Sequence, residues 1–327
     1  MFSDLIKAKS KLPIDFIENL YKDLGQKNAE KCLMGMCQER YTTLRVNSLK
    51  SNTVEIEEQF DKLGICFEKV SFYDDAYIIK NKNEKDLQNL DIYKEGKIYL
   101  QSLSSMVPVL ALEPKENEKI LDLTAAPGSK TTQIAAITKN KAKILANEID
   151  KIRFERLKYN INLQGANAEA INSDGVKINE KYNDYFDRTL IDAPCSGEGR
   201  FLIEKKESYS KWSEKMKEEL AKLQKELLHS AIKATKRGGV IVYSTCTLNK
   251  KEDEDIVNFA VKNYGVRVEK IDLKIKNALK IKHDGDCNSL KIIPSEIMEG
   301  FYIAKLVKIW YISRELDRLL KVKTSLK

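Results

Sequence analysis

The chain has 327 residues, 42% hydrophobic and 32% charged, and is long enough to bury a substantial core without disulfides or metal ions. It contains no apolar run near the roughly 18 residues of a membrane span, which excludes a membrane-embedded class. The N-terminus lacks the apolar segment of an export signal, so we predict a cytoplasmic protein with reduced cysteines.

The net charge is +8, and lysine and arginine are concentrated at residues 200–225 and 304–327. Such a concentration favours a polyanionic partner. The alternative is an ordinary lysine-rich surface exposed to solvent.

The first third of the chain reads as a small α+β module. Helical spacing of apolar residues covers 13–40, and a second helix is predicted over 53–63. Strands are predicted at TTLRVNSLK, YDDAYIIK and GKIYLQS. We place the end of this RRM-like module near residue 113, where proline and charged residues follow, and assign it residues 1–113.

From KILDLT onward, short apolar strands alternate with helices. This alternation predicts an α/β fold with a doubly wound parallel sheet, which we assign to residues 114–308. Two later runs, VRVEKIDL and FYIAKLVKI, are predicted to pair as a hairpin, and residues 309–327 to form a basic helical tail. The predicted strands are KILDLT, KILANEI, AEAINSD, RTLIDAP and GVIVYSTC.

The loop after the first of these strands, Ala125–Lys130, has the geometry of a ligand site at the carboxyl edge of a sheet. It matches neither GxGxxG nor GxxxxGK[ST], so it indicates neither a dinucleotide nor a phosphate-cradling loop. Glu148 ends the second strand, where it can accept ribose hydroxyls, and Asp174 ends the third, near an adenine amino group. These residues predict S-adenosylmethionine as the cofactor, although each acid alone could simply cap a helix.

Two cysteines follow strands on the same edge. Asp192 and Cys195 follow the fourth strand and Cys246 the fifth, so we expect both thiols in one pocket with the cofactor loop. No CxxC pair is present, and we predict no metal site. The remaining four cysteines are interpreted as packing residues, namely Cys32, Cys37, Cys66 and Cys287.

A thiol nucleophile suits a methyl acceptor that is an unreactive ring carbon. Addition of a thiolate to carbon 6 of cytosine makes carbon 5 electron-rich, and Asp192 is the candidate acid that binds the ring nitrogen and amine. A second thiol can assist the later elimination. Lys130 and the helix N-termini at this edge are candidate causes of thiolate formation.

The motifs resemble the RsmB/NSUN family of S-adenosylmethionine-dependent RNA (cytosine-5) methyltransferases. The resemblance rests on LDLTAAPGSKT, LANEID, INSDG, LIDAPCSGEG, YSTCTL and EGFYIAKL and covers about residues 10–308. It implies a Rossmann-like class I methyltransferase fold with Cys246 as nucleophile and Cys195 promoting release. It also implies cofactor or base contacts from Ala125, Ala126, Pro127, Gly128, Ser129, Lys130, Thr131, Glu148, Asp174 and Asp192.

The resemblance has mild departures. Ser129 stands at a frequent glycine position, and Lys250 and Lys251 stand where many members have Pro-Glu. The implied partner is RNA bound by a monomer, with ribosomal RNA preferred over transfer RNA, and the N-terminal module, basic surface and tail are predicted to bind it.

Three alternatives compete with this interpretation. A non-catalytic RNA-binding assembly factor would keep the fold without the chemistry. An amine methyltransferase would need an aromatic residue in the turn Asp-Ala-Pro-Cys, which has none. A DNA cytosine-5 enzyme attacks with the thiol of its Pro-Cys motif and has no counterpart of TCTL, so Cys246 favours RNA.

Overall fold

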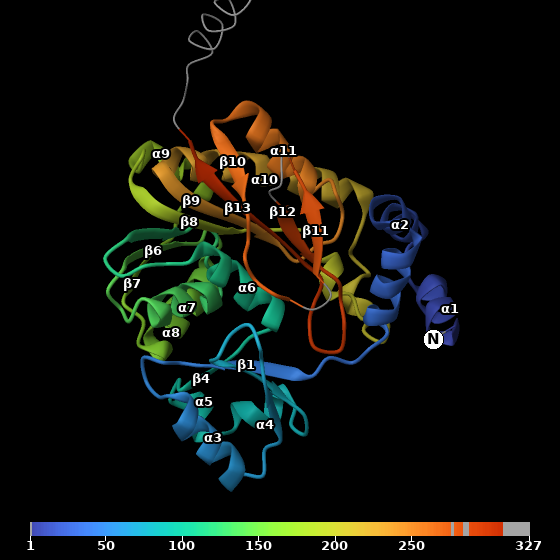
Figure 1. Ribbon diagram of the computed structural model, residues 1–327, viewed down its shortest axis with the longest axis horizontal. Helices are drawn as coiled ribbons and strands as arrows, with labels where there is room; N and C mark the ends of the chain where they lie inside the picture. The colour runs from blue at the N-terminus through green and yellow to red at the C-terminus, as the bar shows by residue number, and fades with distance from the viewer. Residues whose placement is uncertain (1, 276–277, 284–287, 310–327) are drawn as a thin grey trace, which may run out of the picture.

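The computed structural model describes residues 2–275, 278–283 and 288–309 (Figure 1). Cys287 and the predicted basic tail beyond Ile309 lie outside these ranges. None of the helices in the described ranges is both long and apolar enough to cross a membrane.

The main sheet has a parallel half made of the five strands expected from the sequence. Their order is β7-β6-β5-β8-β9, and every neighbouring pair is parallel. The chain winds outward from β5 in one direction through β6 and β7 and then in the other through β8 and β9, which confirms the doubly wound prediction. The strands are β5 (Lys119–Asp122), β6 (Lys143–Asn147), β7 (Ala168–Ile171), β8 (Phe186–Asp192) and β9 (Thr235–Thr245).

Beyond β9 the sheet continues with antiparallel strands in the order β13-β12-β11, and β10 pairs with β13. The two apolar runs at 266–273 and 301–309 therefore do pair, as predicted. They do not form a simple hairpin, because the chain between them forms two further strands, β11 and β12. The strands are β10 (Val266–Glu269), β11 (Ala278–Lys282), β12 (Asn288–Ile292) and β13 (Phe301–Lys308).

Helices cover both faces of the main sheet (Figure 1). On α10, Ala221, Leu228 and Ala231 recur at helical spacing and pack on one face, and the Ser213 hydroxyl caps the first turn. The other face is covered by α6 and α7, with α8 packed beside α7. The helices are α6 (Leu103–Leu112), α7 (Ser129–Ile137), α8 (Lys151–Gln164), α9 (Ile178–Lys181), α10 (Glu214–Ala234) and α11 (Glu254–Asn263).

A separate four-stranded antiparallel sheet, with the order β2-β3-β1-β4, lies below the main sheet in Figure 1. The chain runs β-α-β-β-α-β through it, which is a ferredoxin-like topology, and buries its own core around Phe60 and Tyr77. Its elements are β1 (Thr42–Val46), α3 (Thr53–Lys62), β2 (Phe67–Lys69), β3 (Ala76–Ile79), α4 (Glu84–Gln88), α5 (Asp91–Lys94) and β4 (Ile98–Leu100).

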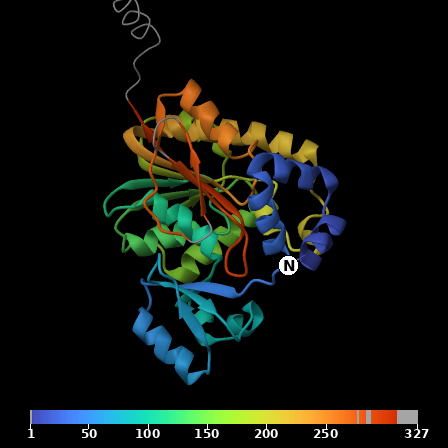
Figure 2. The same cartoon turned by 45° about the vertical axis from the view of Figure 1, so that its right-hand side comes forward.

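The two leading helices, α1 (Phe2–Lys11) and α2 (Ile14–Met36), lie beside the main sheet and away from α3 (Figure 2). Phe16 packs against Phe201 and Trp212, in the loop segment that follows Cys195. In the same cluster Leu248 lies two residues beyond Cys246. The leading helices therefore support the loops that carry both thiols. The helix α6 lies within the predicted module 1–113 but packs on the main sheet. The boundaries 1–113, 114–308 and 309–327 remain a prediction.

Candidate active site

A cleft of about 1230 Å³ opens at the carboxyl ends of the parallel strands. It lies where β5 has β6 on one side and β8 on the other, the position at which doubly wound sheets bind ligands. One wall comes from the small module and includes Tyr99 and Lys85, and the other comes from the strand ends. Both cysteines and most of the predicted cofactor loop, Ala125–Lys130, line this one cleft.

The loop after β5 turns sharply into α7 at Gly128, whose φ is 105°. A Cβ atom added there would lie 3.1 Å from the side chain of Leu157, so α8 packs directly on this turn. Of the residues predicted in this loop, five line the cleft, namely Ala125, Ala126, Pro127, Ser129 and Lys130. Gly128 shapes the turn, and Thr131 is buried and directed toward Asp122.

The two acids predicted to bind the nucleoside both line the cleft. Glu148 is only 3% exposed; its carboxylate accepts the N–H of Asp150 and lies 3.5 Å from Arg153. Asp174 caps the short helix that follows it by accepting the N–H of Val176. Each acid thus has a local structural role as well as a place in the cleft wall.

Asp122, at the end of β5, was not singled out from the sequence. Its side chain is fully buried, one oxygen accepts the Thr131 hydroxyl at 2.6 Å, and the other has no partner within the described ranges. Burial raises the pKa of Asp122 to about 7, although the hydrogen bond from Thr131 opposes this shift. A buried acid with a free oxygen at the edge of the cleft is available to a ligand group that donates hydrogen bonds.

Lys130 and Asp192 form an ion pair at 2.7 Å. The ammonium also donates to the Ser105 hydroxyl at 2.7 Å, and the second oxygen of Asp192 accepts the Ser244 hydroxyl at 2.9 Å. Within the part of the chain that the structure describes, Lys130 makes no hydrogen bond to either thiol. Its charge is directed to Asp192.

The two thiols lie in contact although 51 positions separate them, with 3.2 Å between the sulfurs of Cys195 and Cys246. The backbone N–H of Cys246 also donates to the Cys195 sulfur at 3.3 Å. The hydrogen bond with Cys246 and burial raise the pKa of Cys195 well above its ordinary value. Cys195 therefore keeps its proton and can donate it to the neighbouring sulfur.

Buried polar side chains hold the two cysteine loops together. Asn249 donates to Glu198 at 3.0 Å and to Glu252 at 2.8 Å, and so links the loop after Cys195 to the loop after Cys246. Glu252 also accepts the N–H of Ser196 at 3.0 Å. These bonds fix the relative positions of the two sulfurs.

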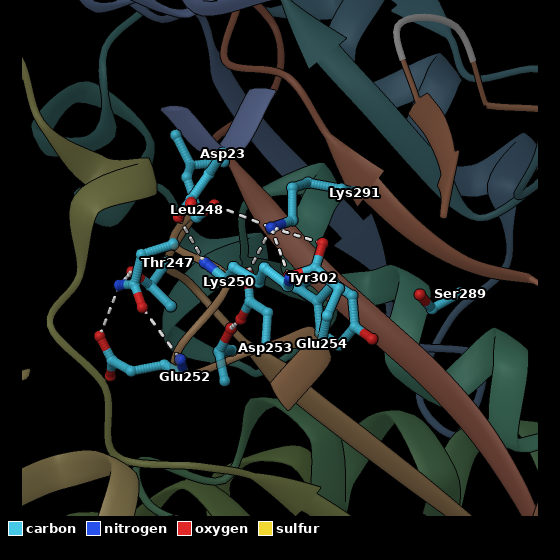
Figure 3. A network of polar contacts seen from close by, with 12 residues as sticks. Asp23, Thr247, Leu248, Lys250, Glu252, Asp253, Glu254, Ser289, Lys291 and Tyr302 are labelled. Atoms are coloured by element: carbon cyan, nitrogen blue, oxygen red, sulfur yellow. Dashed lines mark hydrogen bonds and ion pairs between the residues drawn. The ribbon is translucent and has the colours of Figure 1, made fainter. Parts of the chain in front are cut away.

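A fully buried lysine on β12, Lys291, anchors the far end of the Cys246 loop (Figure 3). Its ammonium lies 3.0 Å from Asp253 and 2.9 Å from Glu254 and donates to the carbonyl of Leu248 at 2.8 Å. Burial lowers the pKa of Lys291, but the two carboxylates outweigh it and the net shift is upward. Lys291 is thus a charged anchor for residues 248–254.

Replacing Lys291 with methionine is expected to lower the free energy of unfolding by about 3 to 5 kcal/mol, because two buried carboxylates lose their counter-charge. Urea denaturation measures the change, and Lys291→Arg, which keeps the charge, should lose less. Lys215→Met is the matched control, since Lys215 is 87% exposed and pairs with Glu219 only at 3.9 Å. Equal stabilities for Lys291→Met and the control would contradict this role.

The doubly wound sheet, the glycine turn after β5 and the acids at successive strand ends define a Rossmann-like methyltransferase fold. Residues 109–307 match the family model described as 16S rRNA methyltransferase RsmB/F. The chain belongs to this methyltransferase family, as the resemblance predicted.

Two curated relatives show the spread of the family. The chain is 33% identical to ribosomal RNA small subunit methyltransferase F of Shewanella loihica, over 94% of this chain and 65% of that protein. It is 36% identical to the tRNA (cytosine(49)-C(5))-methyltransferase of Pyrococcus abyssi, over 81% of this chain and 88% of that protein. The chain thus spans slightly less than two thirds of the length of the Shewanella protein.

The solved structure of a methyltransferase homolog protein from Pyrococcus horikoshii has the same fold. It superposes with a TM-score of 0.78 at 26% identity and covers 94% of this chain and 99% of that one.

Proposed function

We propose that this protein transfers a methyl group from S-adenosylmethionine to carbon 5 of a cytosine in structured RNA, through a covalent bond between Cys246 and the base. The observation that carries the proposal is the contact of two thiols, 3.2 Å apart, in the wall of the cleft that the cofactor loop also lines. A pair of thiols in contact suits covalent addition and elimination at a pyrimidine.

The residues of the cleft fit the proposed cofactor. The loop Ala125–Lys130 would lie along it, Glu148 would accept the ribose hydroxyls, and Asp174 would face the adenine. The buried oxygen of Asp122 that has no partner among the described residues suits the ammonium group of the methionine part. When bound, S-adenosylmethionine supplies an electrophilic methyl group.

The side chains carry the remaining steps. The sulfur of Cys246 bonds to carbon 6, and the pair Asp192–Lys130 binds the exocyclic amine and supplies a proton to ring nitrogen 3. Carbon 5 becomes an enamine carbon and takes the methyl group. The proton on nitrogen 3 then returns to the pair Asp192–Lys130, the proton on carbon 5 passes to a water molecule, and the sulfur of Cys246 leaves as a thiolate. The protonated Cys195 stabilises this thiolate by a hydrogen bond.

RNA is the proposed substrate because one wall of the cleft comes from the small module, which can hold the strand flanking a base turned into the pocket. The relatives are named for both ribosomal and transfer RNA. We favour ribosomal RNA and propose that the small module and basic surface bind it.

The test of the function is methylation of RNA by the purified chain with S-adenosylmethionine. Total RNA is isolated from a strain that lacks the gene and is incubated in vitro with the purified protein and S-adenosylmethionine. Bisulfite sequencing then locates the cytosines that methylation protects from deamination. New 5-methylcytosine at defined sites supports the proposal. RNA binding without any methylation would favour the non-catalytic assembly factor instead.

A further inference from the structure

Arg200 lies in the cleft wall but has no part in the function proposed above. It ends the short 3-10 helix Glu198–Arg200 in the loop that begins at Cys195. The residue is exposed and lines the same cleft as both thiols. Nothing in the motif pattern distinguishes it from the other basic residues at 200–225.

The backbone around Arg200 is tied to the loop that carries Cys246. The N–H of Gly199 donates to the carbonyl of Cys246 at 2.9 Å, and the N–H of Gly300 donates to the carbonyl of Gly199 at 2.9 Å. A Cβ atom on Gly199 would lie 2.0 Å from the carbonyl oxygen of Gly300, so the packing there is backbone against backbone. Arg40 also donates to the carbonyls of Gly199 and Phe201.

The guanidinium of Arg200 folds back over Gly197. That glycine has a φ of 74°, and a Cβ atom on it would lie 3.0 Å from Nη2 of Arg200. The head group is therefore held close to the loop of Cys195.

The ionisable groups near the guanidinium are Cys246, Cys195, Glu299 and Asp192. Glu252 adds a further negative charge on the side of Cys195. The thiolate form of Cys246 is the largest cause of a raised pKa at Arg200, ahead of burial, which lowers it.

Two of the other cations that line the cleft are engaged elsewhere. Lys130 is paired with Asp192 at 2.7 Å, and Arg40 binds backbone carbonyls and lies 4.0 Å from Glu299. Arg200, by contrast, makes no side-chain hydrogen bond or ion pair with any residue in 2–275, 278–283 or 288–309. Its charge remains available to an anion in the cleft.

We propose that Arg200 activates Cys246, its guanidinium charge stabilising the sulfur as the thiolate that attacks the base. This inference rests on the proposed role of Cys246. Electrostatic attraction between two groups acts equally on both. The thiolate of Cys246 stabilises the positive charge of Arg200, and the charge of Arg200 therefore stabilises the thiolate. Arginine suits this task because it stays protonated at every pH at which the thiol titrates.

The test is the pH dependence of alkylation of Cys246 by iodoacetamide, which needs neither RNA nor cofactor. Trypsin separates the two thiols, since Cys246 falls in the peptide 238–250 and Cys195 in 189–200, or in 189–205 when Arg200 is replaced by glutamine. Mass spectrometry therefore follows each thiol. The variants are Arg200→Gln and Arg200→Lys. Arg267→Gln is the matched control, because Arg267 is exposed on β10 and does not line the cleft.

We expect the midpoint for Cys246 to rise by about one pH unit in Arg200→Gln, since a nearby opposite charge shifts a thiol by about 1 to 3 units and solvent screens part of it. It should rise much less in Arg200→Lys and not at all in the control. An unchanged midpoint in Arg200→Gln would overturn the proposal. Equal shifts in both Arg200 variants would do so too, because packing and not charge would then be the cause.

Methylation by Arg200→Gln gives a second readout. Its kcat should fall at neutral pH and recover toward that of the unmodified protein as the pH rises, which a purely structural defect would not produce. If the unmodified protein methylated no RNA while the alkylation midpoint still shifted, the proposed function would fail and the effect of Arg200 would stand.

Discussion

Replacing Cys246 with alanine is expected to reduce methyl transfer by at least about a thousandfold and to remove every covalent complex with RNA. Without the sulfur, no nucleophile adds to carbon 6 of the cytosine. Carbon 5 then stays too electron-poor to take the methyl group. Transfer of a radioactive methyl group to RNA measures the activity, and denaturing gel electrophoresis detects the complex.

The control for this variant is Cys66→Ala, because Cys66 is an exposed cysteine in the small module. It should keep full activity. Binding of S-adenosylmethionine, measured by calorimetry, should be unchanged in both variants, since neither sulfur belongs to the proposed cofactor contacts. Substantial methylation by Cys246→Ala would contradict the covalent route.

Replacing Cys195 with alanine is expected to give a different defect, namely a protein–RNA complex that forms and does not resolve. The attacking sulfur remains, but it loses the hydrogen-bond donor 3.2 Å away that stabilises it as a leaving group. The complex should accumulate during incubation with RNA and S-adenosylmethionine and survive denaturing electrophoresis. Product should form no faster than the complex decays.

The two variants also test the assignment of roles. A persistent complex in Cys246→Ala together with none in Cys195→Ala would exchange the roles of the two sulfurs while leaving the enzyme class intact. Failure of both variants to trap RNA, with normal methylation, would remove the thiols from the chemistry altogether.

The sequence contained most of the parallel sheet because each strand is a short apolar run followed by a helix. The same argument put Cys195 and Cys246 at one edge, where the structure brings their sulfurs into contact. In the parallel half of the sheet, the alternation of strands and helices along the chain was enough to predict where the strand ends meet. The strands β11 and β12 were not predicted, because their short, lysine-containing segments carry little strand signal.

Other features were hidden by tertiary context. The helix α6 is buried on nearly all sides and contains Pro108, so it shows neither amphipathic spacing nor a uniform helix-forming composition. Lys291 reads as one more surface charge, because its partners Leu248, Asp253 and Glu254 come from a distant segment. Asp122 stood next to the recognised loop, and its position at the end of a strand was the signal that could have identified it.

The central claim is tested most directly with RNA in which 5-fluorocytosine replaces cytosine, since fluorine at carbon 5 cannot leave as a proton and elimination stops. The protein is incubated with this RNA and S-adenosylmethionine, digested with trypsin and nuclease, and analysed by mass spectrometry. The account predicts a methylated fluorocytosine nucleotide on the peptide 238–250, which contains Cys246 and no other cysteine. A nucleotide on the Cys195 peptide, or turnover of the fluorinated RNA without any trapped peptide, would contradict it.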